Sequence, residues 1–162
     1  AKGKAESALK KLIKEHKVLN PFQALLACDS LFEFEGEIFE KPINKDQLIS
    51  RWQRMSGNSG YLHTGHYLIS LDNSNSDMES NSPNNICEGV VTTKIEFMEL
   101  SNIEIIKYAS TSEPYNCAGG FAIEGYGGLF IKKIDGCFSN VIGLSLPWLK
   151  ANLEKYGLTE LL

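Results

Sequence analysis

The chain has 162 residues, 43% of them hydrophobic and 22% charged, which is the composition of an ordinary globular domain large enough to bury a core. Its formal net charge of −4 argues against nucleic acid or an anionic membrane surface as a partner. No apolar segment approaches the roughly 20 residues that a membrane-spanning helix needs. The basic N-terminal residues are not followed by the apolar region of a signal peptide.

The four cysteines, Cys28, Cys87, Cys117 and Cys137, are widely spaced and form no C-x-x-C pair. This spacing argues against a zinc site, and small secreted disulfide scaffolds are shorter and denser in cysteine. We therefore expect a reducing, cytoplasmic setting.

The first half of the chain contains both helical and strand patterns. Apolar residues recur at helical spacing in residues 4–17 and again in 46–56, so both segments are predicted to be helices. The run 22–28 is continuously apolar, which predicts a strand buried on both faces. Segment 31–39 alternates apolar and acidic residues around a Glu-Gly turn and predicts a hairpin, and 61–71 predicts a further strand.

The second half opens with the Asn- and Ser-rich segment 72–88, which predicts a solvated, low-complexity loop. Alternation at 93–97 predicts a strand, and a capping box at Ser101 predicts a helix to about residue 110. The glycine-rich stretch 117–136 predicts short strands that backbone or ligand approaches closely. Pro147 predicts the start of a last helix. Strands and helices intersperse without a strict βαβ rhythm, so we expect an α/β domain built on a mixed sheet.

Asp29 stands where the predicted strand 22–28 ends. Ligands of open α/β sheets gather at the carboxyl ends of strands, so a carboxylate here could bind a metal or act as a base. Alternatively, Asp29 and Ser30 turn or cap the chain through side-chain hydrogen bonds. Position alone leaves both interpretations open.

Other polar groups have an ordinary explanation beside a functional one. Lys41, fixed in part by Pro42, could reach a phosphate or be a surface lysine. His63 and His66 lie three residues apart, so on a strand they would face opposite ways and share no metal. Glu124 could accept hydrogen bonds from the edge of a ligand or from nearby backbone N–H groups. The acidic residues around the hairpin could bind a metal or form its exposed side: Glu33, Glu35, Glu37 and Glu40.

Familiar catalytic fingerprints do not occur in the sequence. The stretch GGFAIEGYGG lacks the G-x-G-x-x-G arrangement, and neither G-x-x-x-x-G-K-[ST] nor G-x-S-x-G is present. The residues by themselves therefore point to an α/β domain that could hold a carboxylate-centred site.

Six segments, taken together, carry a resemblance to a known family. They are AKGKAE, LLACDSL, EKP, the Leu62–Gly65 segment, TSEPYNCAGGFAIEGYGGLF and IDGCFSNVIGLSLP. In this order and spacing they resemble the Maf family of nucleoside triphosphate pyrophosphatases, also called septum-formation proteins. The resemblance covers nearly the whole chain, apart from an insertion at 72–88. It implies a single domain over 1–162 with a Maf- or ITPase-like fold, a mixed twisted sheet flanked by helices.

The resemblance also implies an activity and a set of site residues. The reaction would be NTP + water → NMP + pyrophosphate, assisted by Mg²⁺ or Mn²⁺, with non-standard nucleotides as the proposed targets. Asp29 would take the proton or bind the metal. Lys4 and Lys41 would neutralise triphosphate oxygens. Glu124, with Ser30 as its companion, would influence the choice of base, and a homodimer would be the expected assembly.

Several positions depart from the family pattern. Ser30 replaces a threonine and keeps the hydroxyl, and Glu40 replaces the usual glycine before Lys-Pro. Glu124 replaces the glutamine of the subgroup that resembles dTTP and UTP hydrolases, so thymidine and uridine nucleotides are not assigned. A glutamate is closer to the subgroup that acts on methylated guanosine triphosphate, and the base stays open.

Family members carry a first strand and a Ser-x-Ser-Pro-Arg-Arg-like segment before the helix at which this sequence begins. Those arginines would be principal triphosphate ligands with a bidentate geometry that lysine cannot copy. Two hypotheses therefore stand. The first is an N-terminally truncated pyrophosphatase domain. The second is a catalytically inactive homologue that binds nucleotide or a cell-division partner.

Overall fold

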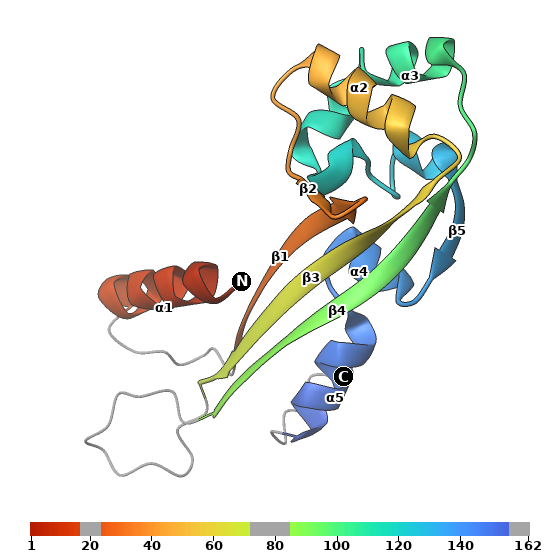
Figure 1. Cartoon of the computed structure of the whole chain (residues 1–162). Helices are drawn as coiled ribbons and strands as arrows, with labels where there is room; N and C mark the ends of the chain where they lie inside the picture. Colours follow the sequence, from red (N-terminus) through yellow and green to blue (C-terminus); the bar gives the residue numbers. More distant parts are fainter. Residues whose placement is uncertain (17–23, 72–84, 156–162) are drawn as a thin grey trace, which may run out of the picture. The chain divides into compact units, whose positions relative to one another are not determined.

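A computed structural model describes residues 1–16, 24–71 and 85–155, which form an α/β structure with helices flanking one sheet (Figure 1). The strand order in the sheet is β2-β1-β3-β4-β5. In chain order the elements are α1 Lys2–His16, β1 Ala24–Phe34, β2 Glu37–Phe39, α2 Lys45–Met55, β3 Ser59–Ser70, β4 Asn85–Phe97, α3 Asn102–Tyr108, the 3₁₀ helices η1 Glu113–Asn116, η2 Ala118–Gly120 and η3 Tyr126–Phe130, then β5 Ile131–Asp135, α4 Phe138–Ile142 and α5 Leu146–Lys155. None of the described helices is long and apolar enough to span a membrane.

The chain divides into two compact units, and three of its strands contribute residues to both. Unit 1 comprises Ala1–Asp29, Gly65–Val90 and Leu146–Leu162, whereas unit 2 comprises Ser30–Thr64 and Val91–Ser145. The unit boundaries therefore fall within β1, β3 and β4.

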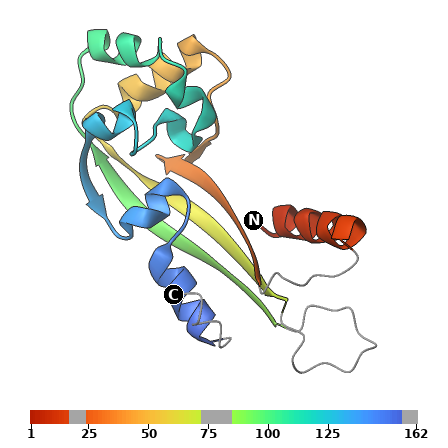
Figure 2. The same ribbon diagram turned by 180° about the vertical axis from the view of Figure 1, so that it is seen from behind.

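In unit 1 the strands are packed on both faces. Tyr67 and Ile69 of β3 cluster with Ala5 of α1. Leu68, which lies between them in the strand, clusters instead with Leu153 of α5. Because side chains alternate between the faces of a strand, α1 and α5 cover opposite faces of unit 1, as the views from the two sides show (Figure 1 and Figure 2).

Strand β1 is longer than the sequence indicated. We expected a strand over residues 22–28 that ends at Asp29, but one unbroken strand runs over Ala24–Phe34, so Asp29 and Ser30 lie in its middle. Residues 22 and 23 lie outside the described part of the chain. Side chains at alternate positions of 24–27 join the clusters of α1 and α5, which confirms packing on both faces. Since the alternation continues, Asp29 and Ser30 point to opposite faces of β1.

The core of unit 2 is aromatic and centres on Trp52 of α2, which is fully buried. Its ring lies 5.3 Å from that of Phe97 and 5.6 Å from that of Tyr108, centroid to centroid, both edge to face. Its indole Nε1 donates a hydrogen bond of 3.0 Å to the carbonyl oxygen of Gly120. A buried N–H is thereby satisfied, and the glycine turn of η2 is fixed to the core.

Several predicted elements are confirmed. The hairpin joins β1 to β2 with Phe34 opposite Glu37, and Glu35 and Gly36 turn the chain at φ of 52° and 80°. The capping box at Ser101 also forms at the start of α3. The α/β class with flanking helices is confirmed, but the described strands pair antiparallel, so the sheet is not mixed as expected.

The glycine-rich segment differs most from expectation. Residues 113–130 contain the three 3₁₀ helices η1, η2 and η3 rather than strands, and within 117–136 the chain forms a strand only in β5. Helix α4 follows where no helix was predicted. Residues 85–88, expected to be loop, begin β4. The rest of the predicted loop, 72–84, lies outside the described residues.

Candidate active site

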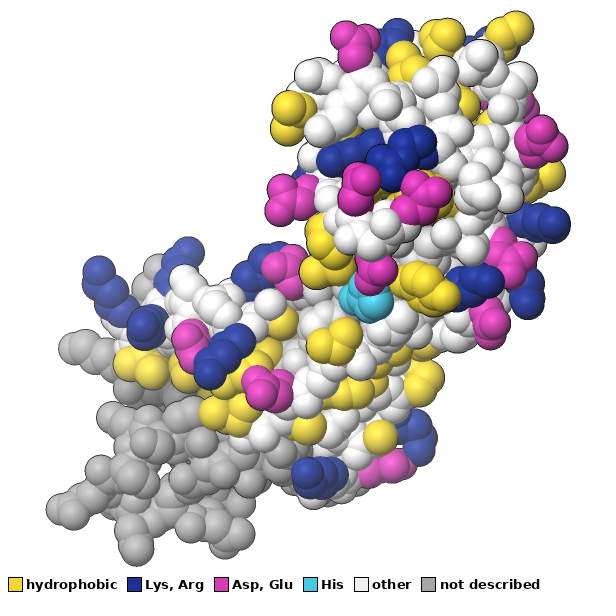
Figure 3. Space-filling model, viewed as in Figure 1, with side chains coloured by type: hydrophobic (Ala, Val, Ile, Leu, Met, Phe, Trp, Pro, Cys, Tyr) yellow, Lys and Arg dark blue, Asp and Glu magenta, His cyan; other side chains and the backbone are white. Residues whose placement is uncertain are grey.

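Two oppositely charged site residues meet in unit 1. Lys4 lies on α1, and its Nζ is 2.5 Å from Oδ1 of Asp29 on β1. The lysine side chain is 62% exposed and the carboxylate 53% exposed, so the pair lies at the surface where a ligand can reach it. Figure 3 shows Lys and Arg side chains gathered over α1, whose sequence carries five lysines. The structure therefore brings two of the predicted residues together.

Ser30 has different partners, all in unit 2. Its Oγ lies 2.8 Å from Oγ1 of Thr64, which donates 3.1 Å to the main-chain oxygen of Asn140. A threonine hydroxyl has one proton, so Ser30 must donate to Thr64. Asn140 Nδ2 in turn donates to the carbonyl of Val91 and to Oγ1 of Thr93, at 3.0 and 3.1 Å. The hydroxyl of Ser30 is thus the outer end of a buried network.

Sequence reasoning missed Thr64 and Asn140, which are both fully buried. Both stand in segments that carry the family resemblance, LHTG and IDGCFSNVIGLSLP, and that was the available signal. Their positions show why the structure does not join Ser30 to the carboxylate of Asp29: the two neighbours face opposite ways from β1.

Lys41 and Glu124, the other predicted residues, are both exposed in unit 2. Both affect the pKa of the Cys117 thiol electrostatically. Burial raises the pKa of Cys117, the carboxylates of Glu124 and Glu113 raise it further, and the Lys41 ammonium opposes them. A cation and a carboxylate are therefore both within electrostatic reach of one thiol.

The loop that follows Glu124 is held by Glu113. The carboxylate accepts hydrogen bonds from the backbone N–H groups of Tyr126 and Gly127 and from the hydroxyl of Tyr108, each 2.8 Å long. Burial acts to raise the pKa of Glu113, but these donors hold it below its usual value. Burial and the bond to Glu113 raise the pKa of Tyr108 strongly, so Tyr108 stays a donor at neutral pH. Sequence reasoning missed Glu113 too, although it stands in the segment TSEPYNCAGGFAIEGYGGLF that carries the family resemblance.

Three of the four acidic residues around the hairpin, Glu33, Glu35 and Glu37, have structural partners. Glu35 and Glu37 both accept from the guanidinium of Arg54, at 2.8 and 3.1 Å. Glu33 lies 3.2 Å from Nε2 of His63. Exposed acidic residues that already have basic partners are typical of a solvent-facing surface. These contacts therefore favour the exposed side of the hairpin over a metal site.

No group of three or more His, Cys, Asp or Glu that could hold a metal ion occurs among residues 1–16, 24–71 and 85–155. His66 is buried while His63 is partly exposed, as expected for residues three apart on a strand. Mg²⁺ is commonly held by one or two carboxylates together with substrate phosphates and water. The exposed carboxylate of Asp29 fits a metal that arrives with a substrate.

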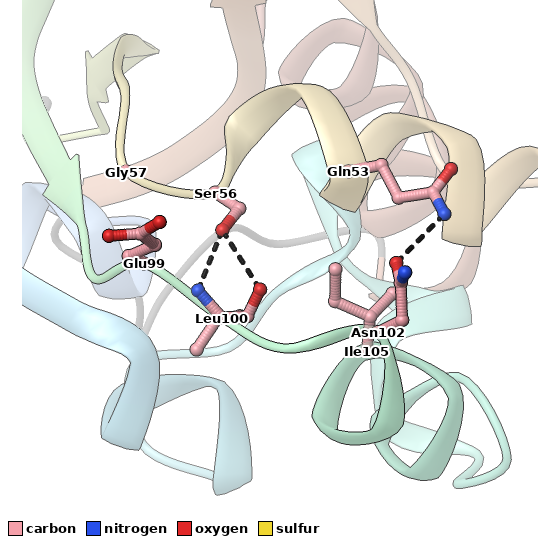
Figure 4. Close-up of a pocket in the computed structure, with 7 residues that line it drawn as sticks. All are labelled: Gln53, Ser56, Gly57, Glu99, Leu100, Asn102 and Ile105. Atoms are coloured by element: carbon pink, nitrogen blue, oxygen red, sulfur yellow. Dashed lines mark hydrogen bonds between the residues drawn. The ribbon is translucent and has the colours of Figure 1, made fainter.

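A hollow of about 610 Å³ lies in unit 2 beside α2 and the start of α3. Gln53 donates to Asn102 across it, and the Ser56 hydroxyl bonds to the backbone of Leu100 (Figure 4). Its volume is in the range of ligand sites. However, its polar groups are largely bonded to one another, and no predicted site residue lines it. We therefore do not assign it to the substrate.

Comparison with known proteins gives consistent matches. The model of the family described as "Maf-like protein" matches residues 1–156. Relatives from Prochlorococcus marinus strains NATL1A and NATL2A are 85% and 81% identical over all 162 residues, which cover 77% of each relative. A relative from a third strain of the same species is 53% identical over 96% of this chain and 75% of its own length. All three are named nucleoside triphosphate pyrophosphatase.

Proposed function

Because this chain belongs to the Maf-like protein family, we propose that it is a nucleoside triphosphate pyrophosphatase, which converts an NTP and water to an NMP and pyrophosphate. The reaction forms a bond from water oxygen to the α-phosphorus and breaks the bond from that phosphorus to the α–β bridging oxygen. It requires an acceptor for the proton of water and cations near the departing pyrophosphate. The observation that carries the proposal is the exposed pair of Lys4 and Asp29.

The two side chains of this pair would have complementary roles. Asp29 would accept the proton of the attacking water or hold a metal, and Lys4 would neutralise phosphate oxygens as a point charge. Exposed ion pairs contribute little to folding stability. The pair can therefore separate and re-form with substrate without loosening the fold.

A divalent cation, Mg²⁺ or Mn²⁺, would supply Lewis-acid stabilisation of the phosphate charge, with Asp29 as the residue of this chain that holds it. Both the metal and this ligand assignment are part of the proposal.

Two residues of unit 2 would have the roles that the family resemblance gives them. Lys41 would be a second phosphate cation, and Glu124 would take part in the choice of base. An ionised glutamate is only an acceptor, so it favours bases that present N–H donors. Ser30 donates its proton to Thr64 and can offer a ligand only acceptor lone pairs. Modified nucleotides and a homodimer remain predictions. A cytoplasmic setting also remains one, and the four free cysteines support it.

The test measures pyrophosphate release from a panel of standard and modified NTPs with Mg²⁺ or Mn²⁺. We expect turnover by the unmodified protein and a loss of about a thousandfold or more in Asp29→Asn, since amide nitrogen neither takes a proton nor binds metal. Asp135→Asn is the matched control, because Asp135 is also an exposed aspartate on a strand. It should leave turnover unchanged.

Two results would contradict the proposal. One is equal turnover by Asp29→Asn and the unmodified protein. The other is nucleotide binding without any pyrophosphate release, which would favour the inactive nucleotide-binding homologue instead.

A further inference from the structure

The stretch 124–128 is held by backbone hydrogen bonds of Gly125 and Gly128 and by one carboxylate, that of Glu113. Its Oε1 accepts from Gly127 N–H and from the Tyr108 hydroxyl, and its Oε2 accepts from Tyr126 N–H. All three bonds are 2.8 Å long, the length of strong bonds to a charged acceptor. Two consecutive backbone N–H groups are thus fixed by one carboxylate.

Steric contacts restrict the same loop. A Cβ at Gly125 would overlap the Glu113 carboxylate, and one at Gly127 would lie 2.7 Å from the Tyr108 hydroxyl. The glycines predicted to allow a close approach are therefore approached by Glu113 and Tyr108. A side chain at Gly125 would displace the carboxylate from its donors, and one at Gly127 would also meet the backbone of Ala122.

Glu124 is the first residue of this stretch and is exposed. It lies near enough to Cys117 to affect that thiol, as Glu113 and Lys41 also do. Only Gly125 lies between Glu124 and Tyr126, the first residue whose backbone N–H Glu113 accepts from. The backbone that follows Glu124 is thus fixed.

We infer that Glu113 is a positioning residue that fixes Glu124 and so determines which nucleobases the site accepts. This rests on the proposed function, in which Glu124 takes part in the choice of base. The favoured ligands carry N–H donors on the base edge that Glu124 would accept. Glu113 itself touches no substrate and acts only through the loop.

The test compares selectivity, defined as the ratio of kcat/KM between the best and worst of ATP, GTP, ITP, CTP and UTP. In Glu113→Gln an amide NH₂ replaces one carboxylate oxygen and opposes a backbone donor, so the loop loosens. We expect the ratio to fall about tenfold, the value of one hydrogen bond. It should fall to the level of Glu124→Ala, with no further fall in the double variant.

Two variants distinguish a loss of the Glu113 contacts from a general loss of folding. Glu104→Gln is the matched control, because Glu104 also accepts a backbone N–H, that of Ser101, at 2.8 Å. It should weaken the cap of α3 and leave selectivity unchanged. Tyr108→Phe removes one donor to Glu113 and keeps both backbone bonds, so it should give an intermediate fall even if Glu113→Gln folds poorly.

The outcomes distinguish this inference from the proposed function. Equal selectivity in Glu113→Gln and the unmodified protein, while Glu124→Ala loses it, would overturn the inference alone. Absence of pyrophosphate release from every NTP would overturn the proposed function. In that case the ratio of Kd values for α,β-methylene GTP and UTP tests the inference, and an unchanged ratio in Glu113→Gln would overturn it.

Discussion

The polar groups of the two units are stabilised in different ways. In unit 1, Asp29 on β1 lies at the surface and pairs with a charged side chain, Lys4 of α1. In unit 2, Glu113 pairs with backbone N–H groups, and Asn140 donates from a fully buried position to a carbonyl and a hydroxyl. Water screens an ion pair at the surface, so its loss costs little stability. A buried polar group that loses its partner has no water to replace it, and the loss costs more. Substitution of the surface pair should therefore change activity more than stability, whereas substitution of Glu113 or Asn140 should lower stability.

The largest expected loss of stability belongs to Asn140→Ala. It removes the donor to Val91 and Thr93 and leaves a cavity, so the free energy of unfolding should fall by about 3 kcal/mol. Urea unfolding measures this. Asn102→Ala, at an exposed asparagine, should change it by less than about 0.5 kcal/mol. Equal losses in the two variants would show that the buried bonds of Asn140 do not stabilise unit 2 more than an exposed asparagine does.

Glu113→Gln should have an intermediate effect that depends on pH. The pKa of Glu113 in the folded protein lies below its usual value, so its ionised form stabilises the fold above the unfolded pKa of about 4.3. That contribution is lost as the pH falls through the folded pKa. The unmodified protein should therefore be about 2 kcal/mol more stable than the variant at pH 7, and the difference should shrink below about pH 4. A difference in urea unfolding that is independent of pH would show that the charge of Glu113 does not matter.

The smallest effect on stability is expected for Lys4→Ala. With both partners more than half exposed, the loss should lie between about 0 and 1 kcal/mol. Pyrophosphate release should nevertheless fall about tenfold or more, because a phosphate cation is removed. Lys10→Ala, at another exposed lysine of α1, should change neither quantity. A stability loss as large as that of Asn140→Ala would make Lys4 a structural residue.

Local patterns predicted much of this fold. The hairpin turn at Glu35, the capping box at Ser101 and the helix predicted over 46–56 depend on neighbouring residues alone, and all three are confirmed. The glycine-rich segment was predicted wrongly because its conformation depends on distant partners. Trp52 binds the carbonyl of Gly120, and Glu113 binds the turn at Tyr126.

The candidate site was likewise predicted only in part. The resemblance supplied Lys4 and Asp29, and the structure places them in contact. It did not single out the hydrogen-bond partners of Ser30, since Thr64 and Asn140 come from strand β3 and helix α4, far along the chain. The length of β1 was also missed, because a charge within an apolar run usually marks an end. Here Asp29 can lie mid-strand because its face of β1 is open at that point.

The unbroken course of β1 makes the spacing of its residues as important as their identity. Adding or removing one residue on the N-terminal side of Asp29, with the register of the preceding residues kept, would exchange the two faces at this point. An insertion would move the carboxylate to the position where Ser30 now meets Thr64, and a deletion would place the hydroxyl of Ser30 beside Lys4. We therefore expect insertions and deletions in this strand to be excluded during evolution even where single substitutions are accepted.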